Sequence, residues 1–176
     1  MATGSLIKID EEIVTSAVAS VELGGANWDS SYDVYKVVMT AITPSTDSTN
    51  LRMRVLKSGA SQSDLEYDYA YKQFRTDTAF QNVVISGGTL WQTTNNSNGT
   101  NTGETAQGIF YLFNFNNASE YSFVTNETSN LTADPILISI IGGGVHTVAS
   151  ASNGLSFFYS SGNIASGTFT LYGLKK

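Results

Sequence analysis

Apolar and polar residues alternate along much of the chain with a period of two, the pattern of β-strands that bury one face and expose the other. The clearest example is residues 51–57, LRMRVLK, in which apolar side chains alternate with cations. Similar alternation or short aromatic runs predict further strands at residues 17–23, 35–42, 64–74, 109–115, 155–159 and 168–174. Residues 64–74 could also form a helix, but the tyrosines at 67, 69 and 71 lie two apart and favour a strand.

Two of these segments, residues 35–42 and 109–115, carry apolar side chains on both faces, which is typical of strands in the middle of a packed sheet. Clusters of Gly, Pro, Asn and Ser separate the apolar segments at short intervals, among them Gly142–Gly144, which we interpret as a turn. No segment has a capped helical stripe, so we expect at most one short helical turn. The pattern predicts an all-β, single-domain antiparallel β-sandwich, jelly-roll-like, over residues 1–176.

Two segments are expected to lie outside the sandwich. Residues 1–12 are predicted to form a short N-terminal arm. Residues 93–105, TTNNSNGTNTGET, contain no apolar side chain and predict a surface loop. Long loops on rigid β scaffolds often carry binding sites, so this loop is either a binding loop or a mobile segment without a function of its own.

Composition narrows the classes of partner. Charged residues make up 14% of the chain, against about 25% in an average soluble protein. The surface must therefore consist mainly of neutral polar groups, which are easier to desolvate in a protein–protein contact than charges. Only nine Lys and Arg residues are present and the net charge is −6, which argues against nucleic acid and anionic membranes as partners.

The chain has no cysteine, which excludes disulfides, thiolate catalysis and Cys-based metal sites. Its first residues show neither a basic leader nor an apolar run of signal-peptide length, and no stretch approaches the length of a membrane span. We therefore expect a soluble protein that is made in the cytoplasm.

Residues that could support catalysis are few. His146 is the sole histidine, so it would have to serve any Ser-His-Asp triad, and a packed or surface histidine is the expected role. Glu66 and Asp68 resemble the start of the E-x-D-x-x-E pattern of laminarinase-type glycosidases, but Tyr71 stands at the third position. These carboxylates, with Asp64, could instead bind Ca²⁺, although a calcium ion needs more oxygens than three side chains offer. We expect no enzyme, no cofactor, no catalytic residue and no metal site.

Aromatic residues leave a carbohydrate-binding alternative open. Trp28 or Trp91 could stack on a sugar ring, although aromatic side chains in a sandwich more often form the core. Five N-x-[ST] sequons are better explained by Asn- and Thr-rich loop composition than by glycosylation; they occur at Asn95, Asn98, Asn117, Asn126 and Asn130.

Four sequence segments resemble those of a known family: SLIKIDEEIVTSAVASVELGG, SSYDVYKVVMTAITPSTDSTNLRMRVLKSG, IFYLFNFNNASEYSFV and LSFFYSSGNIASGTFTLYGLKK. Together they resemble small virion structural proteins of tailed phages of cyanobacteria and other marine bacteria. The resemblance spans Ser5–Lys176. Its most specific part is the closing motif S-G-x-I-x-x-G-T-F-x-L-Y-G-L at Ser161–Leu174, and its weakest part is the Asn-rich loop.

The resemblance implies a bacteriophage virion protein displayed on the particle surface after synthesis in the host cytoplasm. We expect a capsid decoration, or cement, protein that stabilises the outer shell through contacts with the major capsid protein, as a homo-oligomer and more specifically a trimer. The alternative is a tail or fibre accessory module that anchors a neighbour or adheres to a host-surface glycan. The resemblance supplies no catalytic residue, and no binding residue is assigned from the sequence.

Overall fold

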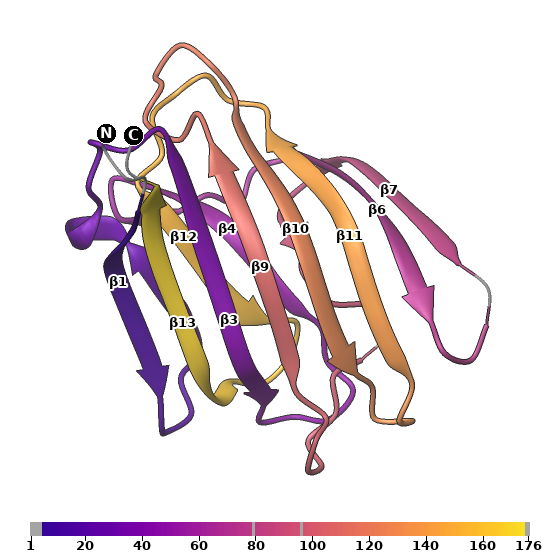
Figure 1. Cartoon of the computed structure of the whole chain (residues 1–176). Helices are drawn as coiled ribbons and strands as arrows, with labels where there is room; N and C mark the ends of the chain where they lie inside the picture. The colour runs from indigo at the N-terminus through magenta and orange to yellow at the C-terminus, as the bar shows by residue number, and fades with distance from the viewer. Residues whose placement is uncertain (1–4, 79, 96, 175–176) are drawn as a thin grey trace.

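A computed structural model of the chain describes residues 5–78, 80–95 and 97–174. It is an all-β structure of two antiparallel sheets packed face to face, a β-sandwich (Figure 1). The larger sheet has eight strands, in the order β1 (Leu6–Val14), β13 (Ile164–Leu174), β3 (Val34–Pro44), β9 (Ala106–Phe113), β10 (Ser122–Leu131), β11 (Leu137–His146), β6 (Tyr67–Arg75) and β7 (Gln81–Gly88).

The smaller sheet covers part of one face of the larger sheet. It has the order β2 (Val21–Gly24), β12 (Gly154–Tyr159), β4 (Leu51–Lys57) and β5 (Ala60–Ser61), and the short β8 (Trp91–Gln92) also pairs with β4. A single turn of 3-10 helix, η1 (Gly25–Asn27), follows β2. The strand order does not confirm the jelly-roll arrangement expected from the sequence. Among the described residues, no helix has the length and apolarity needed to cross a membrane.

Side chains that alternate along the strands form one core between the sheets. Phe110 of β9, Phe157 of β12 and Phe169 of β13 are fully buried, and the Phe157 ring lies 5.1 Å from the Phe169 ring. In β4, Leu51, Met53 and Val55 are buried as the alternation predicts. A smaller cluster of Tyr71, Ile138 and Ile140 lies beneath the β6–β11 part of the large sheet.

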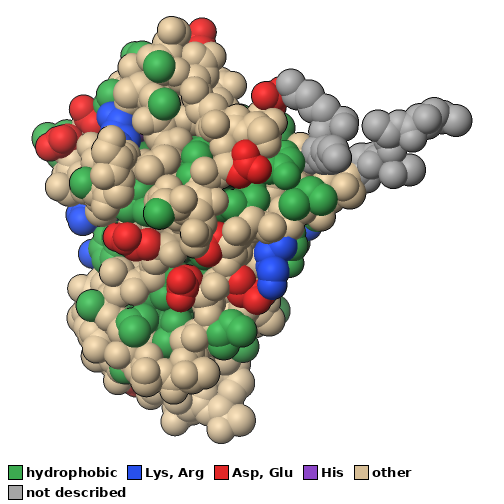
Figure 2. All heavy atoms as spheres, turned by 90° about the vertical axis from the view of Figure 1, so that its left-hand side faces the viewer, with side chains coloured by type: hydrophobic (Ala, Val, Ile, Leu, Met, Phe, Trp, Pro, Cys, Tyr) green, Lys and Arg blue, Asp and Glu red, His purple; other side chains and the backbone are tan. Residues whose placement is uncertain are grey.

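The N-terminal arm expected at residues 1–12 is instead an edge strand over most of its length. Residues 1–4 lie outside the described part, but β1 pairs with β13 from Leu6 opposite Leu174 to Val14 opposite Gly167. Lys8, Asp10, Glu11 and Glu12 fall within β1. Figure 2 looks onto this side of the molecule and shows acidic side chains spread over its surface.

The strand expected at residues 17–23 is correct only at its end. Residues 15–20 carry the chain from β1 in the large sheet to β2 in the small sheet, and Ala17 and Ala19 are exposed. A connection that changes sheets leaves the ladder of its first sheet before it joins the second. Only the single bridge between Val18 and Ile164 interrupts the connection, and β2 begins at Val21.

The prediction of a turn at Gly142–Gly144 is wrong, because these residues are part of β11. The glycines allow close packing against the inner face of that strand. A Cβ atom on Gly142 would lie 2.4 Å from Cβ of Tyr71, and one on Gly144 would lie 2.5 Å from Nε1 of Trp91. A side chain on Gly142 would collide with the adjoining strand β6 at Tyr71, and one on Gly144 would displace the Trp91 ring.

The segment 93–105 is also more buried than a surface loop. Thr93, Thr94, Asn98 and Glu104 are all buried. Hydrogen bonds, and not apolar area, hold the segment in place: the Thr93 hydroxyl donates to the Leu51 carbonyl at 2.8 Å, and the Thr128 hydroxyl donates to the Thr93 carbonyl at 2.7 Å. Its first part therefore connects β4 of one sheet to β10 of the other.

Candidate functional site

The outer face of the eight-stranded sheet is the candidate functional site. On β9, β10 and β11, every second side chain points into the core, so the residues between them point away from the small sheet. Tyr111 is 41% exposed, Phe123 43% and Ile141 52%. We call the surface of these three residues with Val38, Ala70, Val84, Ile109, Thr125, Glu127 and Val145 the outer face.

Two hollows shape the outer face. The first, of about 480 Å³, lies across β3, β9, β10 and β11, with Val38, Ile109 and Ile141 in its lining. The second, of about 520 Å³, lies between β10 and β7, with Phe123 and Val84 in its lining. In the second hollow, β11 contributes Gly143, which has no side chain to fill the space. Both hollows can receive apolar side chains of another protein.

Few charges interrupt this surface. The Lys36 ammonium lies over the Tyr111 ring, 5.7 Å from its centroid. Asp68 accepts a hydrogen bond from the Gly87 amide at 2.7 Å, so its carboxylate is engaged within the sheet. Glu127 and Lys72 are exposed and lie on either side of Ile141 in the register of β10, β11 and β6. The face thus combines apolar and aromatic side chains with a few charges of both signs, as many protein–protein interfaces do.

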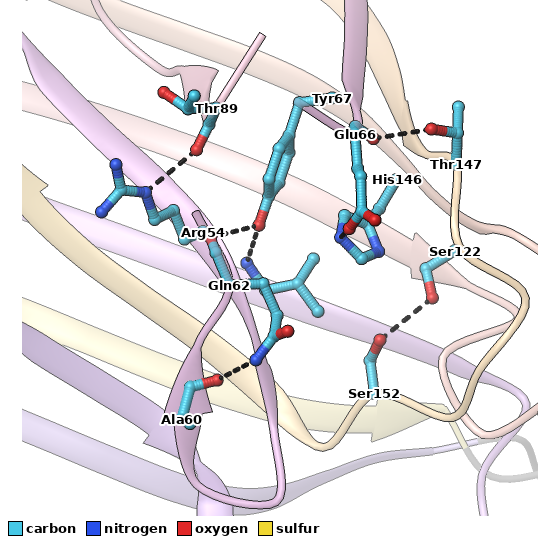
Figure 3. A network of polar contacts seen from close by, with 11 residues as sticks. Arg54, Ala60, Gln62, Glu66, Tyr67, Thr89, Ser122, His146, Thr147 and Ser152 are labelled. Carbon is cyan, nitrogen blue, oxygen red and sulfur yellow. Dashed lines mark hydrogen bonds and ion pairs between the residues drawn. The ribbon is translucent and has the colours of Figure 1, made fainter. Parts of the chain in front are cut away.

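The residues considered for catalysis form a structural contact instead (Figure 3). His146, at the end of β11, is 0% exposed, and its ring lies 4.8 Å from that of Tyr67. Its Nε2 atom is 3.4 Å from a carboxylate oxygen of Glu66. Burial, together with the smaller effect of the nearby Lys57 charge, lowers the pKa of His146 to about 4, so the ring is neutral at pH 7.

Tyr67 is the centre of this polar network. Its hydroxyl accepts a hydrogen bond from the Val55 amide at 3.1 Å and donates one to the Gln62 carbonyl at 2.9 Å. Burial raises the pKa of Tyr67 to about 12, so it stays protonated as a donor. The contacts tie β6 of the large sheet to β4 of the small one.

Neighbouring contacts secure the same end of the sandwich. The Thr147 hydroxyl donates to the Glu66 carbonyl at 3.1 Å, and the hydroxyls of Ser122 and Ser152 lie 3.3 Å apart (Figure 3). These contacts join neighbouring turns and strand ends, and the bond from the Val55 amide to the Tyr67 hydroxyl joins the two sheets.

The carboxylates considered as a calcium-binding alternative are not gathered into a site. Glu66 faces His146, whereas Asp68 bonds to the Gly87 amide on β7. Within the part of the chain that the structure describes, no three acidic or histidine side chains lie close enough together to hold a metal ion.

The tryptophans considered for sugar stacking are both packed. Trp91 is 2% exposed, and its ring lies 5.1 Å from that of Tyr67. Trp28 stacks on Tyr35 at 4.0 Å and donates a hydrogen bond to Asn116. Trp91 therefore has no face free for a sugar, and the outer face presents Tyr111 and Phe123 instead.

The sequon asparagines are not all loop residues. Asn126 and Asn130 lie in β10, on the side that faces the small sheet, and Asn130 is 1% exposed. Asn98 is fully buried. Loop composition therefore explains only some of these sequons.

The outer face was not identified from the sequence, although its signal was present. Residues 109–115 are apolar on both faces, which we interpreted as burial on both faces. The structure buries Phe110 and Leu112 but leaves Tyr111 exposed. An apolar alternation on the uncovered side of a strand is the signal of an interaction surface.

The chain matches no protein-family model and no curated protein.

Proposed function

We propose that this protein is a bacteriophage virion structural protein that binds the outer shell of the capsid and stabilises it. The observation that carries the proposal is the uncovered outer face, with its exposed Tyr111, Phe123 and Ile141. The resemblance of residues 5–176 to small virion proteins of tailed phages supports the same function.

The outer face suits this role because aromatic anchors beside apolar hollows provide most of the binding energy in many protein interfaces. Phe123 projects beside the second hollow and Ile141 beside the first. The partner we propose is the major capsid protein, whose surface would contribute apolar side chains to both hollows. Placed across two shell subunits, such a contact would oppose their separation.

Binding to particles tests the proposal directly. Phe123→Asp and Ile141→Asp place a charge on the outer face without touching the core, because both side chains are about half exposed. Loss of an anchor typically costs about 2 kcal/mol or more, so we expect at least a roughly tenfold weaker retention on particles that lack the native protein. Leu65→Asp is the matched control, since Leu65 is 73% exposed in the bend before β6 and lines neither hollow.

Copy number distinguishes the capsid from the tail. Quantitative gel densitometry of purified virions should find hundreds of copies in each particle. A count of a few to tens would favour the alternative, a tail or fibre accessory module. Absence from the virion would refute both.

A further inference from the structure

Strand β7 ends the large sheet with an open edge. One side of β7 pairs with β6, and among the described residues no strand pairs with its other side. In Figure 1 it is the outermost strand, beyond β6 and away from the small sheet. Alternate backbone amides and carbonyls of an edge strand point outward, so β7 offers a row of hydrogen-bonding groups to any extended chain that fits.

The edge lacks the usual protection against such pairing. The sequence of β7, QNVVISGG, contains no charge and no proline. Val84 is 74% exposed and Ile85 is 38% exposed. The pairing with β6 is irregular between Tyr67 and Tyr69, opposite Ser86 and Gly87, and Gly87 has a φ of 66°. This bulge bends only the end of the strand, so residues 81–85 remain regular.

The opposite edge of the same sheet is built differently. β1 carries Lys8, Asp10, Glu11 and Glu12, and its pairing with β13 shifts register between Lys8 and Asp10. An antiparallel pair of two β1 strands would bring acidic residues close to one another. Charged side chains and a bulge thus protect β1 against pairing with another strand. β7 has no charge, and its bulge lies at one end of the strand.

From this contrast we infer that β7 pairs with β7 of a second copy of this chain. The occupant of the edge must be extended, and it must not bring a charge against uncharged Val84 and Ile85. A second β7 meets both conditions in every antiparallel register, because residues 81–88 contain no charge. The contact is two-fold and self-complementary, and it joins the two large sheets into one.

This pairing extends the proposed function and rests on it for its biological meaning. The two-fold axis of an antiparallel strand pair runs perpendicular to the sheet, so the outer faces of both copies point in the same direction. The dimer would present two outer faces side by side to one shell. The trimer expected from the sequence requires a different, heterologous contact, so the mass of the assembly separates the two.

Sedimentation velocity of the purified protein provides the test. We expect the wild type to have the mass of two chains at tens of micromolar, and Val84→Lys to weaken the dimer at least tenfold, because two like charges then lie on adjoining strands. Leu65→Lys is the matched control, since Leu65 is 73% exposed in the turn before β6, and it should remain dimeric.

Hydrogen exchange gives a second readout in the folded protein. Amides of residues 81–85 that point away from β6 should exchange slowly in the wild type and become fast in Val84→Lys, whereas the β10 amides stay protected in both. A wild type of one or three chains, or a dimer that Val84→Lys leaves intact, would overturn the inference. Because both experiments use purified protein without phage particles, a failure to dimerise is distinct from a failure to bind the shell.

Discussion

At the scale of single residues, His146 makes the stability of the protein sensitive to acid. Its imidazole is fully buried beside Tyr67, and its pKa is lowered from 6.5 to about 4. The unfolded chain therefore binds a proton at a higher pH than the folded chain does. The contribution of His146 to stability is complete above about pH 6.5 and falls as the pH drops towards 4.

The size of the effect follows from the shift. Each pKa unit corresponds to about 1.4 kcal/mol, so the free energy of unfolding should fall by about 3 kcal/mol between pH 6.5 and 4 through this residue. His146→Gln, which is neutral throughout, should show a smaller fall. Urea denaturation of both proteins across this pH range provides the measurement, and parallel pH profiles would contradict the prediction.

Tyr67 offers a second test at this scale. Tyr67→Phe removes a hydroxyl that accepts from the Val55 amide and donates to the Gln62 carbonyl. Because the Val55 amide is buried and would lose its partner, we expect the free energy of unfolding to fall by about 1–3 kcal/mol. Tyr111→Phe, on the outer face, should change it by less than about 0.5 kcal/mol. Equal midpoints for Tyr67→Phe and the wild type in urea would refute the structural role.

At the scale of elements, β13 attaches the edge strand β1 to the rest of the large sheet and contributes to the core. It lies between β1 and β3, and its Phe169 and Leu171 are buried against the small sheet. Phe169→Ala removes a ring that packs on Phe157, so we expect a loss of about 3–5 kcal/mol. Leu174→Ala, at the 43% exposed end of the strand, should cost less than about 1 kcal/mol. Chemical denaturation of the wild type and the two variants measures the free energy of unfolding. Similar losses for Phe169→Ala and Leu174→Ala would be inconsistent with this account.

Sequence patterns identified strands well where they contain one apolar and one polar face. β4 is such a strand, and its alternation matches its burial. The prediction of a turn at Gly142–Gly144 was wrong because tertiary packing outweighed the local turn preference of glycine. Tyr71 and Trp91, which are distant in sequence, occupy the space that the glycines leave. The buried segment from Thr93 was missed because hydrogen bonds to Leu51 and Thr128 bury it, and hydrophobicity carries no signal of them.

The candidate site was harder to predict than the fold. The sequence pattern of an apolar side chain does not show whether a second sheet covers that side chain. Tyr111 and Phe110 are neighbours in β9, yet one faces the outside and the other the core. Only the small sheet, which covers one face of the large sheet, distinguishes them. The extent of that cover is a property of the three-dimensional arrangement.

At the scale of the whole molecule, the protein combines a net charge of −6 with an outer face that carries few charges. If this face binds the capsid, burial of apolar area drives the contact, and salt screens only charged interactions. Raising the ionic strength from about 0.1 M, where the screening length is about 10 Å, to 1 M should therefore leave retention on particles within about twofold.

A protein held by complementary charges would behave differently. Its binding would weaken steeply over the same range of salt, because the screening length falls from about 10 Å to about 3 Å. Pelleting of particles with bound protein in a series of NaCl concentrations measures the retention, with Phe123→Asp as the variant that weakens binding at every concentration. Release of the wild type by salt would place the contact on charged surface such as β1, with Lys8, Glu11 and Glu12, and not on the outer face.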